Sequence, residues 1–401
     1  MMFLRPLARR ATGLLWLSNA AVAVGHEVRR LALVWIAVEL IGESAAYVAA
    51  LQAATLLVLS LWGGAIVDRW DHRWAMVTAD IGRSLVALAL IGVILDGALQ
   101  PWHLFAVSVL LSTLSTLYDP ALQVAVTGAA GSIDALQTLN GLMDGAKRLA
   151  RILVPGLVAA MAAGLPVHHL MTLSASAHAV SAVAVFGAWA ALAPTPRSVI
   201  APIAGRSMWT ELGGAIAAAR AHALMSYAIV GIAVRTACWV SVFYLCLPLR
   251  LLTDLPGGVG AFSLVIAVFG AGNLLGSACA VRFRRRPPGL TTALGRLLMG
   301  HGFVGIAWAP NIGVMLAAGV VAAIGGPLGD LPSLGLLYSD FSAEVVGKIV
   351  GLRSLADAIG MLAAPALIAV FGLSGTMGLW AVVLTLVPLH GGFDRLVVCG
   401  S

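Results

Sequence analysis

Four ionisable residues interrupt an otherwise apolar run, AVAVGHEVRRLALVWIAVEL (residues 21–40): His26, Glu27, Arg29 and Arg30. A single arginine at the centre of a membrane-spanning helix costs about 2.5–3.5 kcal/mol. On a helix, His26, Glu27 and Arg30 fall within one sector of about 100°, with Arg29 about 60° outside it, and Glu27 can pair with Arg30. We therefore expect this face to line water, with His26, Arg29 and Arg30 binding substrate and Glu27 carrying protons.

Charged residues also occur in other apolar runs. Asp80 and Arg83 share one face of their run, and Arg235 lies near the middle of another. We expect Arg235 to join the substrate site, and Asp80 and Arg83 to form a gate near the cytoplasmic helix ends. Within the apolar runs basic residues outnumber acidic ones, which favours an anionic substrate. The basic residues are Arg29, Arg30, Arg83, Lys147, Arg148, Arg151, Arg235, Arg296 and Arg353. The acidic residues are Glu27, Asp80, Asp144 and Asp357, with Asp119 and Asp330 placed toward helix ends.

The composition indicates a membrane protein made of helices. The 401 residues are 60% hydrophobic and 10% charged, with a mean hydropathy of +0.98. Apolar runs of about 20 residues recur, each long enough for a helix to cross the bilayer, and too long for barrel strands. We predict an all-α integral membrane protein with twelve spans: 12–41, 45–66, 74–95, 102–126, 138–164, 168–192, 224–249, 260–281, 290–308, 312–337, 347–371 and 373–393.

Basic residues orient these spans. They gather in the loops that are cytoplasmic if the N-terminus is inside, whereas the opposite loops hold only Arg250. This asymmetry follows the positive-inside rule and predicts a multi-pass protein of the bacterial inner membrane with both termini in the cytoplasm. The net charge of +7 is explained by anionic lipid at the membrane surface, so that no nucleic-acid partner is expected.

The chain is predicted to consist of two pseudo-symmetric halves. A Pro-rich cytoplasmic linker, 193–223, with a possible surface helix from Ser207 to Ala221, separates an N-terminal six-helix bundle (1–192) from a C-terminal one (224–401). The short basic loop in GGAIVDRWDHRW (63–74) returns as GSACAVRFRRRP (276–287), about 213 residues later. Paired halves of this kind are typical of transporters with a substrate site near the membrane midplane.

The first of these loops carries a family resemblance. Gly64, Asp68, Arg69 and Arg73 resemble the G-x-x-x-D-R-x-G-[RK]-[RK] signature of the major facilitator superfamily, with Asp71 at a signature glycine. DRWDHR, ADIGRSL (79–85), LARILVPGLVAA (149–160) and IGGPLGDLPSLGLL (324–337) are similar to the branch that contains macrolide-efflux proteins and the enterobactin exporter. The resemblance implies the major facilitator fold, and a cytoplasmic gate at Gly64, Asp68, Arg69 and Arg73. The fourth span lacks the arginine frequent in drug–proton antiporters, and Val154-Pro155-Gly156 replaces their Gly-Pro pair.

These observations favour a monomeric, proton-coupled exporter of a small anionic or zwitterionic metabolite, such as a siderophore or metallophore. A macrolide or multidrug efflux pump, a lysophospholipid transporter of the same fold, and a receptor that transports nothing are the alternatives. The sequence holds no HExxH, paired-cysteine, nucleophile-elbow or phosphate-loop motif, so we predict no enzyme activity, cofactor or bound metal. The expected partners are the small-molecule substrate, protons and membrane lipids.

Overall fold

The computed structural model describes residues 7–390 except 8, 68–69, 162–165, 193–207 and 256. Every regular element in this part of the chain is helical, which confirms the predicted all-α class. The long helices are α1 (Arg10–Ile41), α2 (Ala46–Val67), α3 (His72–Leu95), α4 (Pro101–Ala130), α5 (Ile133–Met161), α6 (His168–Ala188), α7 (Met208–Arg220), α8 (Ala223–Val240), α9 (Leu247–Thr253), α10 (Gly258–Arg282), α11 (Pro288–Ala307), α12 (Ile312–Asp340) and α13 (Ala343–His390). Short turns are η2 (Gly42–Ala45), η3 (Trp189–Ala191), η4 (Ser241–Cys246) and η5 (Phe283–Arg285).

The helices confirm a multi-span membrane protein but not the number of spans. Within the described residues, eight segments are long and apolar enough to cross a membrane: Arg10–Leu59, His72–Leu95, Pro101–Ala130, His168–Ala191, Ala223–Thr253, Gly258–Arg282, Ile312–Asp340 and Val345–Trp380. The first covers predicted span 12–41 and part of 45–66, and the last covers 347–371 and the start of 373–393. Helix α5, which carries five charged residues, and helix α11 fall outside this set. The count of twelve therefore stays a prediction.

Two long helical segments change direction for identifiable reasons. Gly372 has φ 66° and ψ 172°, which interrupts α13 between two helical stretches, and glycine adopts such a conformation without steric cost. Between α8 and α9 the turn η4 is π-helical, and the amide of Leu247 bonds to the carbonyl of Val242. Pro248 lies at the start of α9 and has no amide hydrogen to offer, so the preceding turn widens.

Local signals in the sequence explain where several helices begin and end. The Asp71 side chain accepts a hydrogen bond from the backbone amide of Arg73 and caps α3, and Asn311 caps α12 through the amide of Val314. Pro101 begins α4 at the position that needs no amide hydrogen, and Gly131, with φ 75°, ends it. Helix α7 occupies the stretch predicted as a surface helix, and its position on the membrane stays a prediction.

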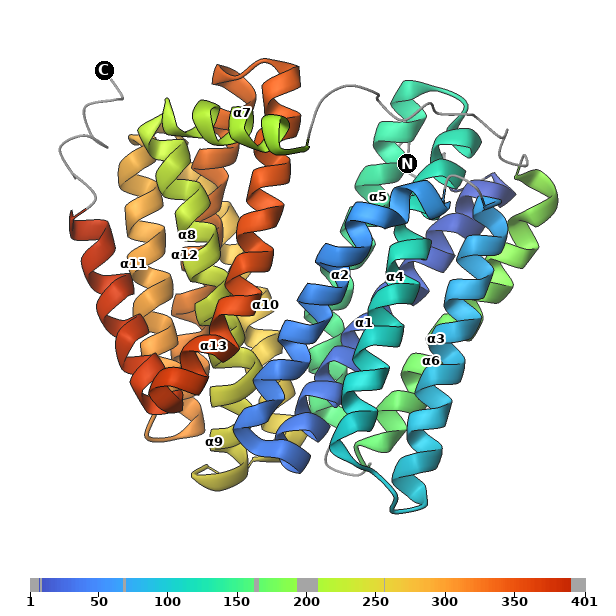
Figure 1. The fold of residues 1–401 in the computed structure, drawn as a ribbon, viewed down its shortest axis with the longest axis horizontal. Coiled ribbons are helices and arrows are strands. Elements are labelled where there is room, and N and C mark those ends of the chain that lie inside the picture. Colours follow the sequence, from blue (N-terminus) through green and yellow to red (C-terminus); the bar gives the residue numbers. More distant parts are fainter. Residues whose placement is uncertain are drawn as a thin grey trace. The chain divides into compact units, whose positions relative to one another are not determined.

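The chain divides into two compact units, Met1–Ile41 with Leu51–Pro202 and Gly42–Ala50 with Ile203–Ser401. In the first unit α1 packs against α4, α5 and α6, and α3 packs against α4 and α6 (Figure 1). Its buried core includes Leu15, Met76, Tyr118 and Leu139. In the second unit α12 packs against α10 and α11, and α13 packs against α8 and α11. Boundaries at 192 and 223 are not tested and stay a prediction.

Small residues let helices of the second unit approach closely. A Cβ atom added to Gly302 of α11 would lie 2.3 Å from the amide nitrogen of Ala322, and one added to Gly295 would lie 2.3 Å from that of Gly329. Both distances are below van der Waals contact, so the backbones of α11 and α12 touch at these glycines. Membrane helices commonly associate through small residues, because lipid provides no hydrophobic force to bring them together.

We predict that Gly302→Ala destabilises the protein by about 1–3 kcal/mol, as overpacking does, since the new methyl group meets the backbone of α12. The matched control is Gly335→Ala in α12, where an added Cβ meets nothing within 4 Å. The control should be neutral or slightly stabilising because alanine favours helix. Thermal unfolding in detergent measures both, and equal melting temperatures would contradict the proposed backbone contact.

Candidate functional site

The cluster predicted on α1 forms two adjacent pairs. Arg30 donates to Glu27 Oε2 from Nε at 3.0 Å and from Nη2 at 2.6 Å, which confirms the predicted pairing. Nη2 of Arg29 lies 2.9 Å from Nδ1 of His26. A guanidinium only donates hydrogen bonds, so Nδ1 of His26 accepts this one and carries no proton. Glu27 and Arg29 are buried, whereas His26 is exposed.

Glu27 is also shared with α5. Its Oε1 lies 3.7 Å from Nε of Arg151, whose side chain is exposed. The side chains of Trp16 and Asn19 hold α1 against α5 by donating to backbone carbonyls of that helix at 3.2 and 3.1 Å. One carboxylate therefore faces two guanidinium groups, Arg30 and Arg151. Because a single negative charge cannot neutralise both, this part of the first unit keeps a positive surplus.

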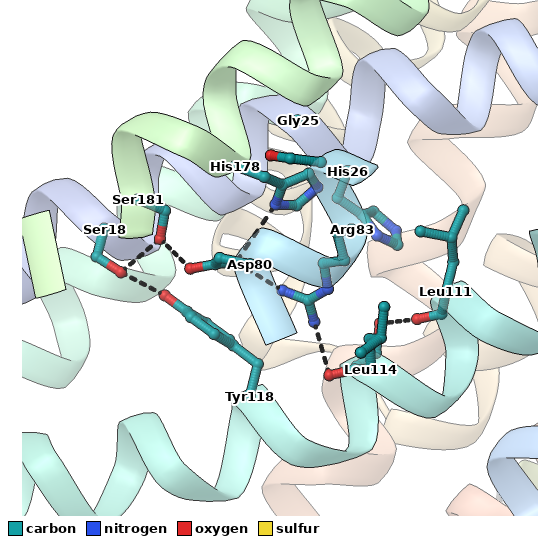
Figure 2. Close-up of polar contacts among 12 residues, drawn as sticks. Ser18, Gly25, His26, Asp80, Arg83, Leu111, Leu114, Tyr118, His178 and Ser181 are labelled. Atoms are coloured by element: carbon teal, nitrogen blue, oxygen red, sulfur yellow. Dashed lines mark hydrogen bonds and ion pairs between the residues drawn. The ribbon is translucent and has the colours of Figure 1, made fainter. Parts of the chain in front are cut away.

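Asp80 of α3 is the centre of a second, fully buried network (Figure 2). Its Oδ1 lies 3.1 Å from Nη1 of Arg83 and 3.4 Å from Nδ1 of His178 on α6. Its Oδ2 accepts a hydrogen bond of 2.5 Å from Ser181. The guanidinium of Arg83 also lies over the ring of Tyr118 on α4, 4.9 Å from its centroid. Charge is tolerated in this interior because each group has a close partner.

A chain of hydroxyl groups extends this network to α1. The Ser18 hydroxyl lies 2.7 Å from that of Ser181 and 2.7 Å from that of Tyr118 (Figure 2). The network thus joins α1, α3, α4 and α6. Asp80 and Arg83, predicted as gate residues, are placed inside the first unit and pair with one another. Their role as a gate stays a prediction.

The second unit holds a comparable charged cluster around Asp330 of α12. Arg235 of α8 donates to Asp330 Oδ2, and its Nη2 lies 3.6 Å from Asp357 of α13. Arg296 of α11 approaches Oδ1 of Asp330 at 3.3 Å and donates to the Gly231 carbonyl at 2.7 Å. Arg353 lies nearby and donates to Ser333. Here three arginines face two carboxylates, which again leaves positive charge in excess.

The loop that resembles the superfamily signature is only partly described. Asp68 and Arg69 lie outside the described residues, and Gly64 lies in α2. Arg73 holds Asp71 through Nε at 3.0 and 3.1 Å and through Nη2 at 2.6 Å. These side-chain hydrogen bonds keep the pKa of Asp71 below its ordinary value, although partial burial opposes them. Arg73 also donates to the Leu192 carbonyl.

A cavity of about 690 Å³ lies elsewhere, between α1 and α6, and its lining includes Arg10, Leu14, Leu17, Val183 and Gly187. It contains none of the residues predicted to bind substrate, so we do not assign it to the substrate. In the described part of the chain no group of three or more His, Cys, Asp or Glu side chains is placed to hold a metal ion.

Sequence reasoning missed several members of these clusters. Asp330 was expected toward a helix end, yet it lies ten residues inside the C-terminal end of α12 and pairs with two arginines. Ser18, Tyr118 and Ser181 gave no signal, because isolated hydroxyl residues are common in apolar helices. The sequence alone leaves His178 open as a packing residue or a functional one, because it does not give the position of His178 beside Asp80.

The chain combines apolar helices long enough to cross a membrane with a fold shared by solved transporters, and its family model makes it a membrane transporter of the major facilitator superfamily. The chain belongs to the transmembrane secretion effector family, whose model matches residues 2–326. Solved structures with a similar fold include the nucleoside transporter NupG (12% identity, TM-score 0.67, covering 98% of this chain and 99% of that one). Others are a POT family transporter in complex with a thioalcohol-conjugated peptide (14%, 0.68, 95% and 95%) and a bacterial metal transporter (13%, 0.66, 98% and 98%). A search of curated protein sequences finds no match.

We predict that Arg83→Met destabilises the protein by about 3–5 kcal/mol, because it leaves the buried carboxylate of Asp80 without its closest cation. The control is Arg148→Met on α5, whose partner Asp144 is exposed and whose loss should cost no more than about 0.5 kcal/mol. Denaturation in detergent compares the two variants. Similar small losses in both would show that the Asp80 pair does not stabilise the first unit.

Proposed function

We propose that this membrane transporter is a secondary active exporter, working as a monomer in the bacterial inner membrane with both termini cytoplasmic. By alternating access, coupled to protons, it moves a small anionic or zwitterionic metabolite of the siderophore or metallophore class. The observation that carries the proposal is the sharing of Glu27 by Arg30 and Arg151, repeated where Arg235 and Arg296 share Asp330. The family description, a secretion effector, supports export.

The surplus of positive charge selects the sign of the ligand. A site with more guanidinium groups than carboxylates concentrates anions, and the planar fork of arginine suits carboxylates and phosphates. A lipophilic cation would meet like charge on α1 and α5. His26 and Arg29, which are bonded to one another, provide further donors for an anionic group. Arg235 provides the corresponding donor in the second unit, where it is part-buried.

Glu27 couples this site to protons in the proposal. In the ionised state its carboxylate holds Arg30, so a ligand carboxylate has to compete for the same guanidinium. A proton on Glu27 weakens the pair and leaves Arg30 for the ligand. An ammonium group of a zwitterion would instead compete with the proton for Glu27. The pH dependence of binding therefore distinguishes the two ligand types.

The cytoplasmic loop completes the proposal. Gly64, Asp68, Arg69 and Arg73 are proposed to form a gate, together with Asp80 and Arg83. The contacts of Arg73 with Asp71 and the Leu192 carbonyl support an ordered turn at the start of α3, which a gate requires.

We predict that Arg30→Ala and Arg235→Ala each weaken binding of a carboxylate-rich siderophore about tenfold or more, because a hydrogen bond to a charged group contributes about 1.5–3 kcal/mol. Thermal-shift titration of purified protein with siderophores, macrolides and lysophospholipids identifies the ligand class, and Arg148→Ala serves as the control with an exposed pair. Tight binding of a macrolide cation that is indifferent to both substitutions would refute the anionic substrate.

We predict that Glu27→Gln abolishes transport driven by a pH gradient while the protein stays folded, because the amide neither takes up a proton nor holds Arg30 as an ion pair. Proteoliposomes with an imposed gradient measure this effect. Unchanged gradient dependence in the variant would remove Glu27 from the coupling mechanism.

A further inference from the structure

His178 lies in the interior of the first unit, with one ring edge toward Asp80 and the other toward α1 (Figure 2). Its side chain is 1% exposed, and Nδ1 is 3.4 Å from Oδ1 of Asp80. A Cβ atom added to Gly25 would lie 3.1 Å from Nε2, so this nitrogen is against the backbone of α1. Among the described residues, neither ring nitrogen makes a hydrogen bond. A buried imidazole in such a position is costly to keep and calls for an explanation.

The hydroxyl chain fixes the charge of Asp80. An ionised carboxylate only accepts hydrogen bonds, so Ser181 donates to it. Ser18 must then donate to Ser181, and Tyr118 must donate to Ser18, since each hydroxyl has one hydrogen. A proton on Oδ2 of Asp80 would reverse this order. Arg83 also holds Oδ1 of Asp80 at 3.1 Å, so both carboxylate oxygens meet a donor, as suits the ionised form.

An additional proton is consequently best placed on His178. The groups that face it are Asp80 and Arg83 on α3, and His26 and Arg29 on α1. Oδ1 of Asp80, which Arg83 also approaches at 3.1 Å, is the acceptor for an imidazolium at 3.4 Å, and the positive charges of Arg83 and Arg29 oppose the added proton. His26, which follows Gly25, has an exposed side chain.

We propose that His178, held beside Asp80, is a second proton-binding site of the transporter, separate from Glu27. The ring takes a proton from water and presents Nδ1–H to Asp80, and the hydroxyl chain from Tyr118 keeps Asp80 ionised to receive it. Proton binding at His178 stands by itself, whereas its part in coupling rests on the proposed function. The added positive charge lies beside the residues proposed to bind substrate on α1.

Nitrogen NMR of ¹⁵N-histidine-labelled protein in lipid nanodiscs tests proton binding without any substrate. The chain has nine histidines, and the signal absent from His178→Asn, or from His178→Gln if that variant folds better, identifies the residue. We expect this signal to move from the neutral to the imidazolium position as the pH is lowered to about 5. In Ser181→Ala, where Asp80 loses its strongest donor, the titration should shift. A signal that stays neutral to pH 5 in folded protein would overturn the proposal.

Transport assays then separate the two proposals. His178→Gln should reduce pH-gradient-driven transport at least about fivefold, the low end of coupling between sites, whereas His301→Gln should not, because that exposed ring bonds within α11 to the Leu297 carbonyl. If His178 titrates but His178→Gln transports normally, the coupling role is wrong. If wild-type protein shows no gradient-driven transport while His178 titrates, the proposed function fails and proton binding at His178 stands.

Discussion

The high cost of moving charge out of water is the constraint on which this structure depends. A carboxylate or guanidinium in an apolar interior is stable only with a close partner of opposite sign. Asp80 with Arg83, Glu27 with Arg30, and Asp330 with Arg235 satisfy this requirement. Ion pairs also join helices, since Arg235 of α8 meets Asp330 of α12 and Arg151 of α5 meets Glu27 of α1, and such partners cannot separate without exposing charge. Function is therefore built from the same contacts that stabilise the fold.

The number of arginines around each buried carboxylate separates a carboxylate whose charge is only balanced from one that lies in a cluster able to bind an anion. Asp80 is enclosed, and its surroundings balance it. Glu27 and Asp330 are different, since each faces two arginines and lies in a cluster where guanidinium groups remain in excess. A ligand carboxylate can bind one of the two arginines there, because Glu27 or Asp330 still keeps the other arginine as its partner. Buried pairs that lack such a surplus can hold a proton or fix a helix, but have nothing to offer an anion.

The sequence was sufficient for the chemistry along a single helix and insufficient for chemistry between helices. Helical spacing predicted that Glu27 meets Arg30 and that Asp80 meets Arg83, since residues three apart share a face. The same spacing could not join Arg235 to Asp330, which are 95 positions apart, or His178 to Asp80. It also placed Arg29 outside the sector of His26, although the long arginine side chain bends back to bond it. The number of spans depends on bends at Gly42 and Gly372, which both have positive φ values. A bend at a single glycine does not show in the hydrophobic periodicity of the sequence.

The two units use different means to hold their helices together, despite the repeated loops that predict pseudo-symmetry. In the second, glycines such as Gly295 and Gly302 bring α11 and α12 to backbone contact, an arrangement that admits little rearrangement because interiors are close-packed. In the first, α1, α3, α4 and α6 meet through the hydroxyls of Ser18, Ser181 and Tyr118 around Asp80. Charged and hydrogen-bonded side chains respond to a nearby proton, whereas glycines packed against a backbone carry no group that does. Proton-dependent change is therefore better suited to the first unit, and the second is better suited to act as a rigid support for Arg235.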